Sequence, residues 1–315
     1  MPVDLTIVIV TWNTREMIRN CLASIEKADP DHTWDVIVVD NASEDQTPAM
    51  IRERFPWVRL KVNKTNLGFG RANNLVLKEV ASPYVLCLNS DTLLLKETIP
   101  AFLKYMQANP KVGLAGGQLI YPDGRLQNAI AFFPTLLTEL TNKSLLQALF
   151  PKKFPGKYHP PTLPTEVDSV IGAAMMIRME ALKSVHYFDE GYFFFLEETD
   201  LCFRLKAAGW KIVFLPHVQI VHFQGSSVRQ VKPQARVEYQ RSLIRYFGKN
   251  HGPVSAKIIR KYGYLKSWVG LLGALLGRLL KHGQTPAWEK YTYLLAWYHK
   301  GCPDDMGLQP SKAGK

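Results

Sequence analysis

The stretch Tyr84 to Asp91, YVLCLNSD, decides the fold. Its apolar run, residues 84–88, has the length of a fully buried strand and stops abruptly at Asn89, Ser90 and Asp91. Such a strand brings one carboxylate to the carboxyl edge of an open α/β sheet, where these sheets bind their ligands. A hard divalent cation bound there through oxygen ligands would also hold a diphosphate. The alternative is that Asn89 and Asp91 only cap a turn before the next helix.

The segments before this stretch alternate between two hydrophobic patterns. Apolar, β-branched runs typical of buried strands occupy residues 5–10, 36–39 and 58–62. Apolar residues at helical spacing occupy residues 15–27, 48–55 and 71–80. Strands that alternate with helices predict βαβ units. The expected fold class is therefore α/β, with a mostly parallel central sheet flanked by helices.

Each predicted strand ends in a polar cluster. These clusters contain Thr11 and Asn13, Asp40 and Asn41, and Asn66. Right-handed crossovers return the chain in one sense, so these strand ends are expected to share one rim of the sheet. A carboxylate such as Asp40 at the end of a second strand suits a ribose or a base edge. A role for Asp40 as a helix or turn cap is the alternative.

A second cluster of acidic residues follows an aromatic run. Residues 193–196, FFFL, come directly before Glu197, Glu198, Thr199 and Asp200, and residues 201–209 have helical spacing. Acids at a helix N-terminus are favoured by the helix dipole, which is the plain structural interpretation. The functional interpretation is that an acid beside aromatic rings is partly desolvated, so its raised proton affinity suits a general base for a hydroxyl nucleophile.

A histidine follows the next predicted strand, residues 211–215. Lone histidines are more often structural than ligands. Near an oxygen-ligated metal, however, His222 would complete the coordination shell. Residues 142–164 are rich in Lys and Pro and predict a long loop of the kind that covers binding sites.

The composition limits the class of protein. With 315 residues, 47% of them hydrophobic, the chain has enough apolar residues for a sizeable core. Its scattered cysteines form neither a metal-type pair nor a disulfide framework, which favours a reducing compartment. The first ten residues lack a basic leader and a cleavage pattern, so no signal peptide is expected. No apolar run is long enough to cross a bilayer.

The whole net charge of +12 comes from the C-terminal part of the chain. Residues 1–223 carry 23 Lys and Arg against 23 Asp and Glu, whereas residues 224–315 carry 16 against 4. A basic tail on a neutral body predicts an anionic partner. Basic residues interleaved with Trp, Tyr and Leu in residues 264–280 favour helices at an anionic membrane surface, and helices packed on the body are the alternative. Nucleic acid is not expected, because no binding motif is present.

Seven segments, in order, resemble the family-2 glycosyltransferases of the rhamnosyltransferase-like branch over residues 4–230. They are IVIVTWN (7–13), VVDNASEDQT (38–47), NLGFGRANN (66–74), LNSD (88–91), GAAMMIR (172–178), FDEGYFFFLEETDLCFRLKAAGW (188–210) and HFQGSS (222–227). The resemblance implies a GT-A fold and an inverting transfer of a sugar from a nucleotide-sugar, dependent on Mg²⁺ or Mn²⁺. It also implies a dTDP- or UDP-sugar donor, with rhamnose favoured, and a glycan or lipid-linked glycan acceptor in cell-surface polysaccharide synthesis.

The resemblance also implies roles for single residues. Asn89-Ser90-Asp91 occupies the place of the metal-binding triplet, with Asn89 where the family has its first carboxylate, so Asp91 is the expected metal ligand and His222 its partner. Glu198 lies where the family often has an aspartate base, and Glu197 and Asp200 are competitors for that role. The implied nucleotide-sugar contacts are Thr11, Asn13, Asp40, Asn41, Asn66, Arg71, Asn89, Ser90 and Asp91.

The expected organisation is a glycosyltransferase domain followed by an appendage. Residues 1–230 would form the GT-A domain, with a nucleotide-binding part at about 1–115 and an acceptor-binding part at about 116–230. Residues 231–315 would form a basic, amphipathic helical region that holds the protein peripherally at the cytoplasmic, inner face of the cell membrane. Two alternatives remain: a catalytically weak nucleotide-sugar-binding protein, and a glycoside hydrolase that uses paired carboxylates.

Overall fold

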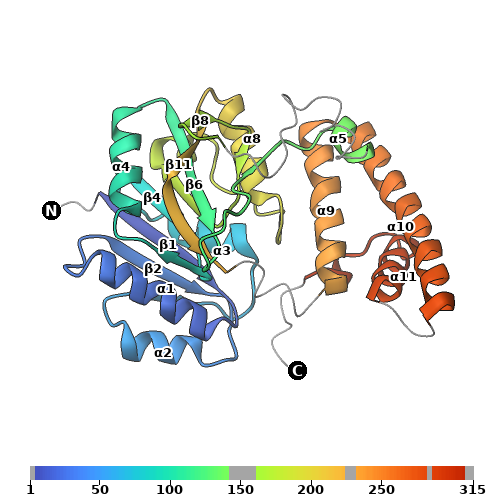
Figure 1. Ribbon diagram of the computed structural model, residues 1–315, viewed down its shortest axis with the longest axis horizontal. Coiled ribbons are helices and arrows are strands. Elements are labelled where there is room, and N and C mark those ends of the chain that lie inside the picture. The colour runs from blue at the N-terminus through green and yellow to red at the C-terminus, as the bar shows by residue number, and fades with distance from the viewer. Residues whose placement is uncertain (1–3, 142–160, 224–231, 282–285, 309–315) are drawn as a thin grey trace.

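The computed structural model describes residues 4–141, 161–223, 232–281 and 286–308 (Figure 1). Most of the loop predicted at residues 142–164 therefore lies outside the described residues. In Figure 1 an α/β body surrounds one large sheet, and a group of helices from the C-terminal part lies beside that body. Within the described residues the sheet has nine strands, in the order β3-β2-β1-β4-β10-β6-β11-β5 with β8 paired to β11.

The first half of the sheet is parallel, as the alternating pattern predicts. Its strands are β1 (Leu5–Thr11), β2 (Asp35–Asp40), β3 (Arg59–Val62) and β4 (Tyr84–Asn89). In the register of β1, Thr11 lies opposite Asp40 of β2 and Val10 opposite Asn89 of β4. The polar ends of the three strands therefore meet at one edge of the sheet.

The second half of the sheet mixes strand directions. Its strands are β5 (Thr92–Leu94), β6 (Val112–Ile120), β8 (Thr165–Glu166), β10 (Ala174–Arg178) and β11 (Lys211–His222). Strand β10 runs antiparallel between β4 and β6, β11 is parallel to β6, and β5 and β8 are antiparallel to β11. Two short strands, β7 (Ile130–Ala131) and β9 (Ser169–Val170), form a separate antiparallel pair.

Strand β11 is longer than the sequence predicts. The pattern places its end at residue 215, but the strand continues to His222 after a register shift between Leu215 and Gln219. The expectation was wrong because the irregularity breaks the apolar pattern without breaking the strand. The extension pairs with β5, with His222 opposite Thr92, and so brings His222 beside the end of β4.

Helices cover both faces of the sheet (Figure 1). One face packs against α1 (Arg15–Ala28), α2 (Thr47–Arg54) and α4 (Thr98–Ala108), and the other against α3 (Phe69–Leu77), α7 (Met179–Ser184) and α8 (Glu197–Ala207). Along β1, Ile7 and Ile9 face the first layer and Val8 faces the second. Burial on both faces explains the continuous apolar runs, since each buried Val or Ile contributes roughly 1.5–3 kcal/mol.

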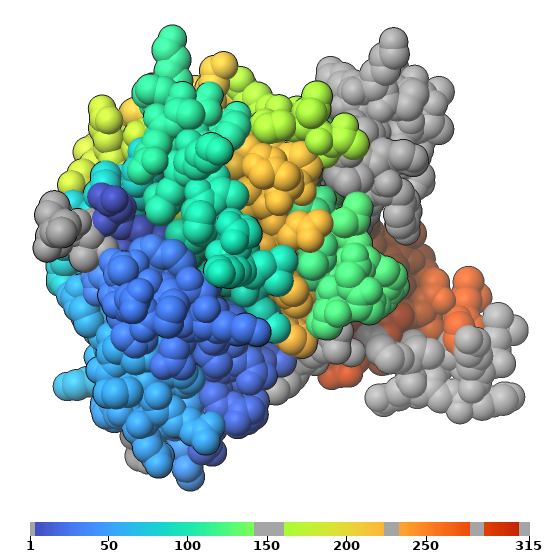
Figure 2. All heavy atoms as spheres, turned by 60° about the vertical axis from the view of Figure 1, so that its left-hand side comes forward, coloured from blue at the N-terminus to red at the C-terminus, as the bar shows by residue number. Residues whose placement is uncertain are grey.

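The C-terminal part forms three helices, α9 (Lys232–Asn250), α10 (Pro253–Lys281) and α11 (Pro286–His299), and a short 3₁₀ turn η1 (Asp304–Met306). Helix α9 packs on the body, because Tyr246 and Phe247 join Tyr192 in one buried cluster that also receives α5 (Leu136–Leu140). Helices α10 and α11 pack on α9 and on each other through a second cluster around Trp297. In Figure 2 most of the C-terminal part is hidden, and its orange-red atoms emerge at the right-hand side of the green body.

The sequence left two alternatives for this region, helices at a membrane surface and helices packed on the body. Helix α9 is packed on the body. The outer face of α10 is different, because several of its large apolar side chains remain exposed. Among the described residues, no helix combines the length and the apolar character required to cross a membrane.

Candidate active site

A cavity of about 510 Å³ opens at the carboxyl ends of β1 and β4. The residues that line it come from nine separate parts of the chain. They are Val10, Thr11, Trp12, Asn41, Asn66, Gly68, Phe69, Asn89, Ser90, Asp91, Ile171, Gly172, Ala173, Phe193, Phe194, Phe195, Glu197, Glu198, His222, Gln234, Gly307 and Leu308. The cavity thus combines the sheet edge, the aromatic run, the acids of α8 and the C-terminal segment.

Asp91 and His222 lie together on one side of this cavity. Oδ1 of Asp91 is 3.4 Å from Nε2 of His222, and the backbone amide of Phe223 donates to the carbonyl oxygen of Asp91 at 2.9 Å. Pairing of β5 with β11 fixes both residues at adjacent strand ends. The two side chains present one carboxylate oxygen and one imidazole nitrogen to the same space.

Gln127 determines which nitrogen of His222 carries the proton. Its side-chain amide nitrogen donates to the carbonyl oxygen of His222, so its Oε1 is the atom that lies 3.0 Å from Nδ1. An amide oxygen only accepts hydrogen bonds, and therefore Nδ1 is the donor. In the neutral imidazole this leaves the lone pair of Nε2 directed at Asp91, the tautomer that metal-binding histidines adopt.

This donor set fits a divalent cation that accepts oxygen and imidazole ligands, such as Mn²⁺ or Mg²⁺. No group of three or more Asp, Glu, His or Cys side chains suited to a metal occurs among the described residues. A cation at Asp91 and His222 would consequently keep several coordination positions for water and phosphate oxygens, which is typical of Mg²⁺ sites that bind substrate phosphates.

The N-terminus of α8 supplies two acids to the cavity. Helix α8 begins at Glu197, four residues earlier than the apolar spacing indicates, so the acids occupy its first turn. Glu198 is partly exposed to the cavity, and its Cβ and Cγ lie 3.4 Å from the position that a Cβ on Gly172 would take. The absence of a side chain at Gly172 therefore keeps the approach to Glu198 open.

Burial raises the pKa of both acids, and that of Glu197 more strongly. It raises the pKa of Glu198, although the backbone amides of Glu198 and Thr199 donate to the carboxylate and act in the opposite direction. Burial raises the pKa of Glu197 well above its usual range, and the negative charges of Glu198 and Glu238 add to that effect. Oε2 of Glu197 has no hydrogen-bond partner within the described part of the chain. Both acids line the cavity, but Glu198 is the more exposed of the two, and two backbone amides support its ionised form against one for Glu197.

Asp200 does not line the cavity. Its fully buried carboxylate accepts hydrogen bonds from Nε of Arg204 at 2.7 Å, from Nζ of Lys249 at 2.9 Å and from the amide of Asn250 at 3.3 Å. These contacts join α8 to α9, and they place Asp200 in the packing of the C-terminal helices.

Six of the nine residues expected to contact the nucleotide-sugar line the cavity: Thr11, Asn41, Asn66, Asn89, Ser90 and Asp91. Hydrogen bonds to Thr14 and Gly68 connect three of these residues to neighbouring parts of the rim. The hydroxyl of Thr14 lies 2.8 Å from that of Thr11 and 3.0 Å from that of Ser90, and the amide of Asn41 donates to the carbonyl oxygen of Gly68 at 3.1 Å.

Three of the expected residues lie elsewhere. Arg71 forms a solvent-exposed ion pair with Glu190, and Asn13 accepts a hydrogen bond from the backbone amide of Glu44. Asp40 is completely buried at the end of β2. Its Oδ2 accepts from the amide of Ser43 at 2.9 Å, while its Oδ1 has no partner within the described residues.

Several residues in or directly beside the cavity had no signal in the sequence. Gln127 lies outside any periodic segment, yet it orients His222. Gly307 and Leu308 belong to the C-terminal segment, and the backbone amide of Leu308 is bonded to Glu238 of α9 at 3.2 Å. Contacts of this kind between distant segments depend on packing and leave no local pattern.

Comparison with known proteins identifies the family to which this chain belongs. The family model described as glycosyl transferase family 2 matches residues 6–185, which is more than half of the chain. The match includes the strands of the parallel half and the segment with Asp91.

Two relatives match over most of their length. The N-acetylglucosaminyl-diphospho-decaprenol L-rhamnosyltransferase of Mycobacterium tuberculosis is 27% identical over 262 residues, which cover 78% of this chain and 85% of the relative. The rhamnosyltransferase WbbL of Escherichia coli is 25% identical over 254 residues, which cover 77% of this chain and 92% of the relative.

Two solved structures share the fold. The mannosyltransferase PcManGT from Pyrobaculum calidifontis, solved with GDP-Man and Mn²⁺, superposes with a TM-score of 0.55 at 18% identity and covers 96% of this chain and 87% of that one. Residues 1–349 of TarS from S. aureus superpose with a TM-score of 0.51 at 16% identity. The match covers 94% of this chain and 91% of that one. These likenesses establish the GT-A fold with a helical C-terminal region. The chain therefore belongs to glycosyl transferase family 2, is similar to its rhamnosyltransferases, and is a glycosyltransferase.

Proposed function

We propose that this glycosyltransferase moves rhamnose, with inversion, from a dTDP-sugar to a hydroxyl of a lipid-linked glycan, and that it requires a divalent cation. The observation that carries the proposal is that Asp91, His222 and Glu198 line the same cavity. A cation-binding pair and an accessible carboxylate in one cavity are what a diphosphate leaving group and a hydroxyl nucleophile require.

In the proposed reaction Glu198 accepts the proton of the acceptor hydroxyl. The acceptor oxygen forms its bond to the anomeric carbon on the face opposite the nucleoside diphosphate, whose bond to that carbon breaks. When bound by Asp91 and His222, a Mg²⁺ or Mn²⁺ ion supplies positive charge beside the departing diphosphate. The aromatic residues 193–195 exclude water from the cavity, so the sugar is transferred to the acceptor and not to water.

The nucleoside would occupy the rim built by Thr11, Asn41 and Asn66. We assign it to the part of the domain at about residues 1–115, and the acceptor to the part at about 116–230. A nucleoside donor group that reached Oδ1 of Asp40 would satisfy a buried oxygen that has no partner among the described residues. The rhamnose donor and the lipid-linked acceptor follow from the similarity to rhamnosyltransferases.

We also propose that residues 231–315 hold the enzyme peripherally at the inner face of the cell membrane, where a lipid-linked acceptor is present. The support is the charge of this region, 16 basic against 4 acidic residues in residues 224–315, together with the exposed apolar face of α10.

A single-turnover assay with dTDP-rhamnose, Mn²⁺ and a short-chain prenyl-diphosphate N-acetylglucosamine tests the reaction. The wild-type chain is expected to transfer the sugar, and Glu198→Gln to lose transfer by roughly 10²–10⁴-fold while it still binds the donor. Asp91→Ala is expected to weaken Mn²⁺-dependent donor binding. Glu180→Gln, an exposed acid of α7 outside the cavity, is the matched control and should behave as wild type.

Three results would contradict the proposal. Undiminished transfer by Glu198→Gln would remove Glu198 as the base. Donor binding without transfer by the wild-type chain would indicate a nucleotide-sugar-binding protein. Cleavage of a glycan without a nucleotide-sugar, unaffected by a chelator, would indicate a glycoside hydrolase.

A further inference from the structure

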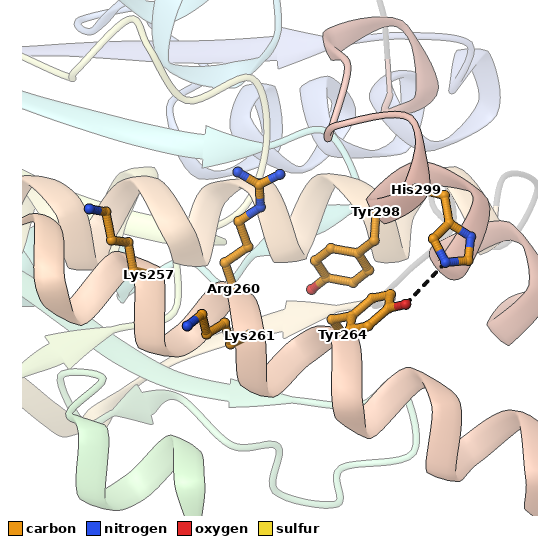
Figure 3. A pocket seen from close by; sticks show the side chains of 6 residues that line it. All are labelled: Lys257, Arg260, Lys261, Tyr264, Tyr298 and His299. Carbon is orange, nitrogen blue, oxygen red and sulfur yellow. Dashed lines mark hydrogen bonds between the residues drawn. The ribbon is translucent and has the colours of Figure 1, made fainter.

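A second cavity, of about 470 Å³, lies between α10 and α11 (Figure 3). Lys257, Arg260, Lys261 and Tyr264 of α10 line it from one side, and Tyr298 and His299 of α11 from the other. None of these residues belongs to the active-site cavity. The lining thus consists of three cations, two phenols and one imidazole, and it contains no carboxylate.

The three cations of this cavity differ from those of the neighbouring helix. On α9, Arg241 pairs with Glu238, Arg245 with Asp189, and Lys249 with both Asp189 and Asp200. In the described part of the chain, by contrast, no ion pair with a carboxylate involves any of the three cations of the cavity, and all three side chains are exposed. Their positive charge is therefore available to an anion from outside the protein.

The aromatic residues behind the cations are held in place. The hydroxyl of Tyr264 lies 3.1 Å from Nε2 of His299, and this bond is drawn in Figure 3. Tyr298 is buried, and its hydroxyl donates to Gln240 of α9 at 3.2 Å. At Gly263 a Cβ would come within 2.2 Å of that hydroxyl, so α10 and α11 pack closely beneath the cavity. The basic side chains consequently project from a rigid base.

An apolar stripe on α10 borders the cavity. Val254, Ile258, Leu265, Val269, Leu272 and Leu276 recur at spacings of three, four and seven residues, which places them on one side of the helix. Five of them are between 57 and 70% exposed, and Ile258 is 37% exposed. The buried residues Ile259, Gly263, Ser267 and Ala274 lie on the opposite side, against α9 and α11. Lys257 and Lys261 border the stripe on the side that faces α11.

We propose that this cavity binds the phosphate of an anionic phospholipid headgroup while the apolar stripe of α10 enters the acyl-chain boundary of the same bilayer. The inference refines the membrane contact proposed above. Arginine and lysine donors suit the oxygens of a phosphodiester, and the hydrogen-bonded pair of Tyr264 and His299 keeps one further donor for them. An exposed apolar stripe next to such donors suits a lipid, which presents phosphate and hydrocarbon side by side, and it does not suit a nucleic acid.

Vesicle flotation with the full chain, without donor or acceptor, tests the proposal. The vesicles contain phosphatidylcholine alone or phosphatidylcholine with 30% phosphatidylglycerol. We expect binding to the anionic vesicles, and a weakening of about 25-fold in Arg260→Gln/Lys261→Gln, since each basic residue near an anionic surface contributes roughly fivefold. The matched control is Lys266→Gln/Lys300→Gln, which removes the same charge from exposed positions outside the cavity and is expected to weaken binding by less than about fivefold.

A second pair of variants tests the stripe. Leu265→Gln/Leu272→Gln changes two exposed side chains, so the fold should be unaffected, and binding to both kinds of vesicle is expected to fall. All variants should transfer sugar to a detergent-solubilised, short-chain acceptor at the wild-type rate, because none of these residues lines the active-site cavity. The vesicle measurement does not depend on transfer, so failure of the proposed reaction and failure of this inference are distinguishable.

Four results would overturn the proposal. One is equal weakening by the two charge-removing variants, which would indicate general electrostatics. Another is equal binding of the wild-type chain to neutral and anionic vesicles. A third is thermal stabilisation by millimolar glycerol phosphate or inorganic phosphate without vesicle binding, which would indicate a site for a free anion. The fourth is binding of an oligonucleotide that depends on Arg260 and Lys261 while vesicles are not bound.

Discussion

Nε2 of His222 lies 3.4 Å from Oδ1 of Asp91, although the two residues are 131 positions apart in the sequence. Pairing between β5 and β11 creates this proximity, and Gln127 completes it by accepting a hydrogen bond from Nδ1. Three residues that are far apart in the chain thereby produce one directed pair of metal-ligand atoms. The following predictions test this pair, the acids of α8 and the attachment of the C-terminal helices.

Gln127→Leu is expected to weaken Mn²⁺ binding in the presence of dTDP by about 10–100-fold, the usual effect of losing a residue that orients a metal-binding histidine. The reason is that Nδ1 of His222 loses its acceptor, so neither the tautomer nor the ring orientation remains fixed. Isothermal titration calorimetry with Mn²⁺ measures the change without relying on turnover. Wild-type affinity in a folded Gln127→Leu protein would show that Gln127 does not orient the ligand.

Transfer activity is expected to fall as the pH drops through a value above 4.5, the ordinary pKa of glutamate. Burial raises the pKa of Glu198, and a general base must be ionised to accept a proton. Activity should therefore be lost on the acid side of the profile and retained above it. The pH dependence of kcat/KM reports this group in the free enzyme. An acid limb below pH 4.5 would contradict the assignment.

Glu197→Gln is expected to increase the free energy of unfolding at pH 8 by about 1 kcal/mol, a common effect of a single substitution. The pKa of Glu197 is raised in the folded state by burial, so the folded protein binds more protons than the unfolded chain, and Glu197 destabilises the fold as the pH rises through that raised pKa. The difference between variant and wild type should vanish below pH 4.5. Thermal unfolding at pH 4 and pH 8 provides the comparison, and a loss of stability at pH 8 would oppose it.

Asp200→Ala is expected to destabilise the protein by about 3 kcal/mol, because it removes the buried partner of Arg204 and one of the two carboxylates that pair with Lys249. Urea unfolding gives the magnitude. The control is Asp123→Ala, which removes an acid from an exposed pair with Arg125 and should change the stability far less than Asp200→Ala. A small effect of Asp200→Ala accompanied by complete loss of transfer would instead make Asp200 a catalytic residue.

Acidification from pH 4 to pH 2 is expected to release α9 from the body. Burial tends to raise the pKa of Asp189, but hydrogen bonds from Lys249, Gly191 and Arg245 outweigh it and lower that pKa from 3.8 to about 2. The carboxylate therefore stabilises the folded state above pH 4, and this contribution is lost as the pH falls toward 2.

Hydrogen exchange of the α9 amides across this pH range measures the release. Asp189→Asn should show weaker protection of α9 already at neutral pH, and the change between pH 4 and pH 2 should be smaller in that variant. Identical pH profiles for the two proteins would exclude Asp189 as the group responsible.

Much of the fold could be predicted because its signals are local. The apolar run before Asn89 identifies a buried strand, and its alternation with helices identifies the parallel half of the sheet. The end of β11 could not be predicted in this way, since the register shift after Leu215 interrupts the pattern while the strand continues. The position of His222 depends on that continuation.

The candidate site likewise has some features that could be predicted from local patterns and others that could not. The sequence by itself determined the residue types at the strand ends and at the start of α8, among them Asp91 and Glu198, because strand termini and helix N-termini carry polar residues in recognisable patterns. Only the tertiary structure decided that Glu198 faces the cavity while Asp200 pairs with Lys249, and that Gln127 reaches His222. The physical reason is that local patterns report burial and backbone geometry, whereas the partner of a side chain is set by which distant segments pack against it.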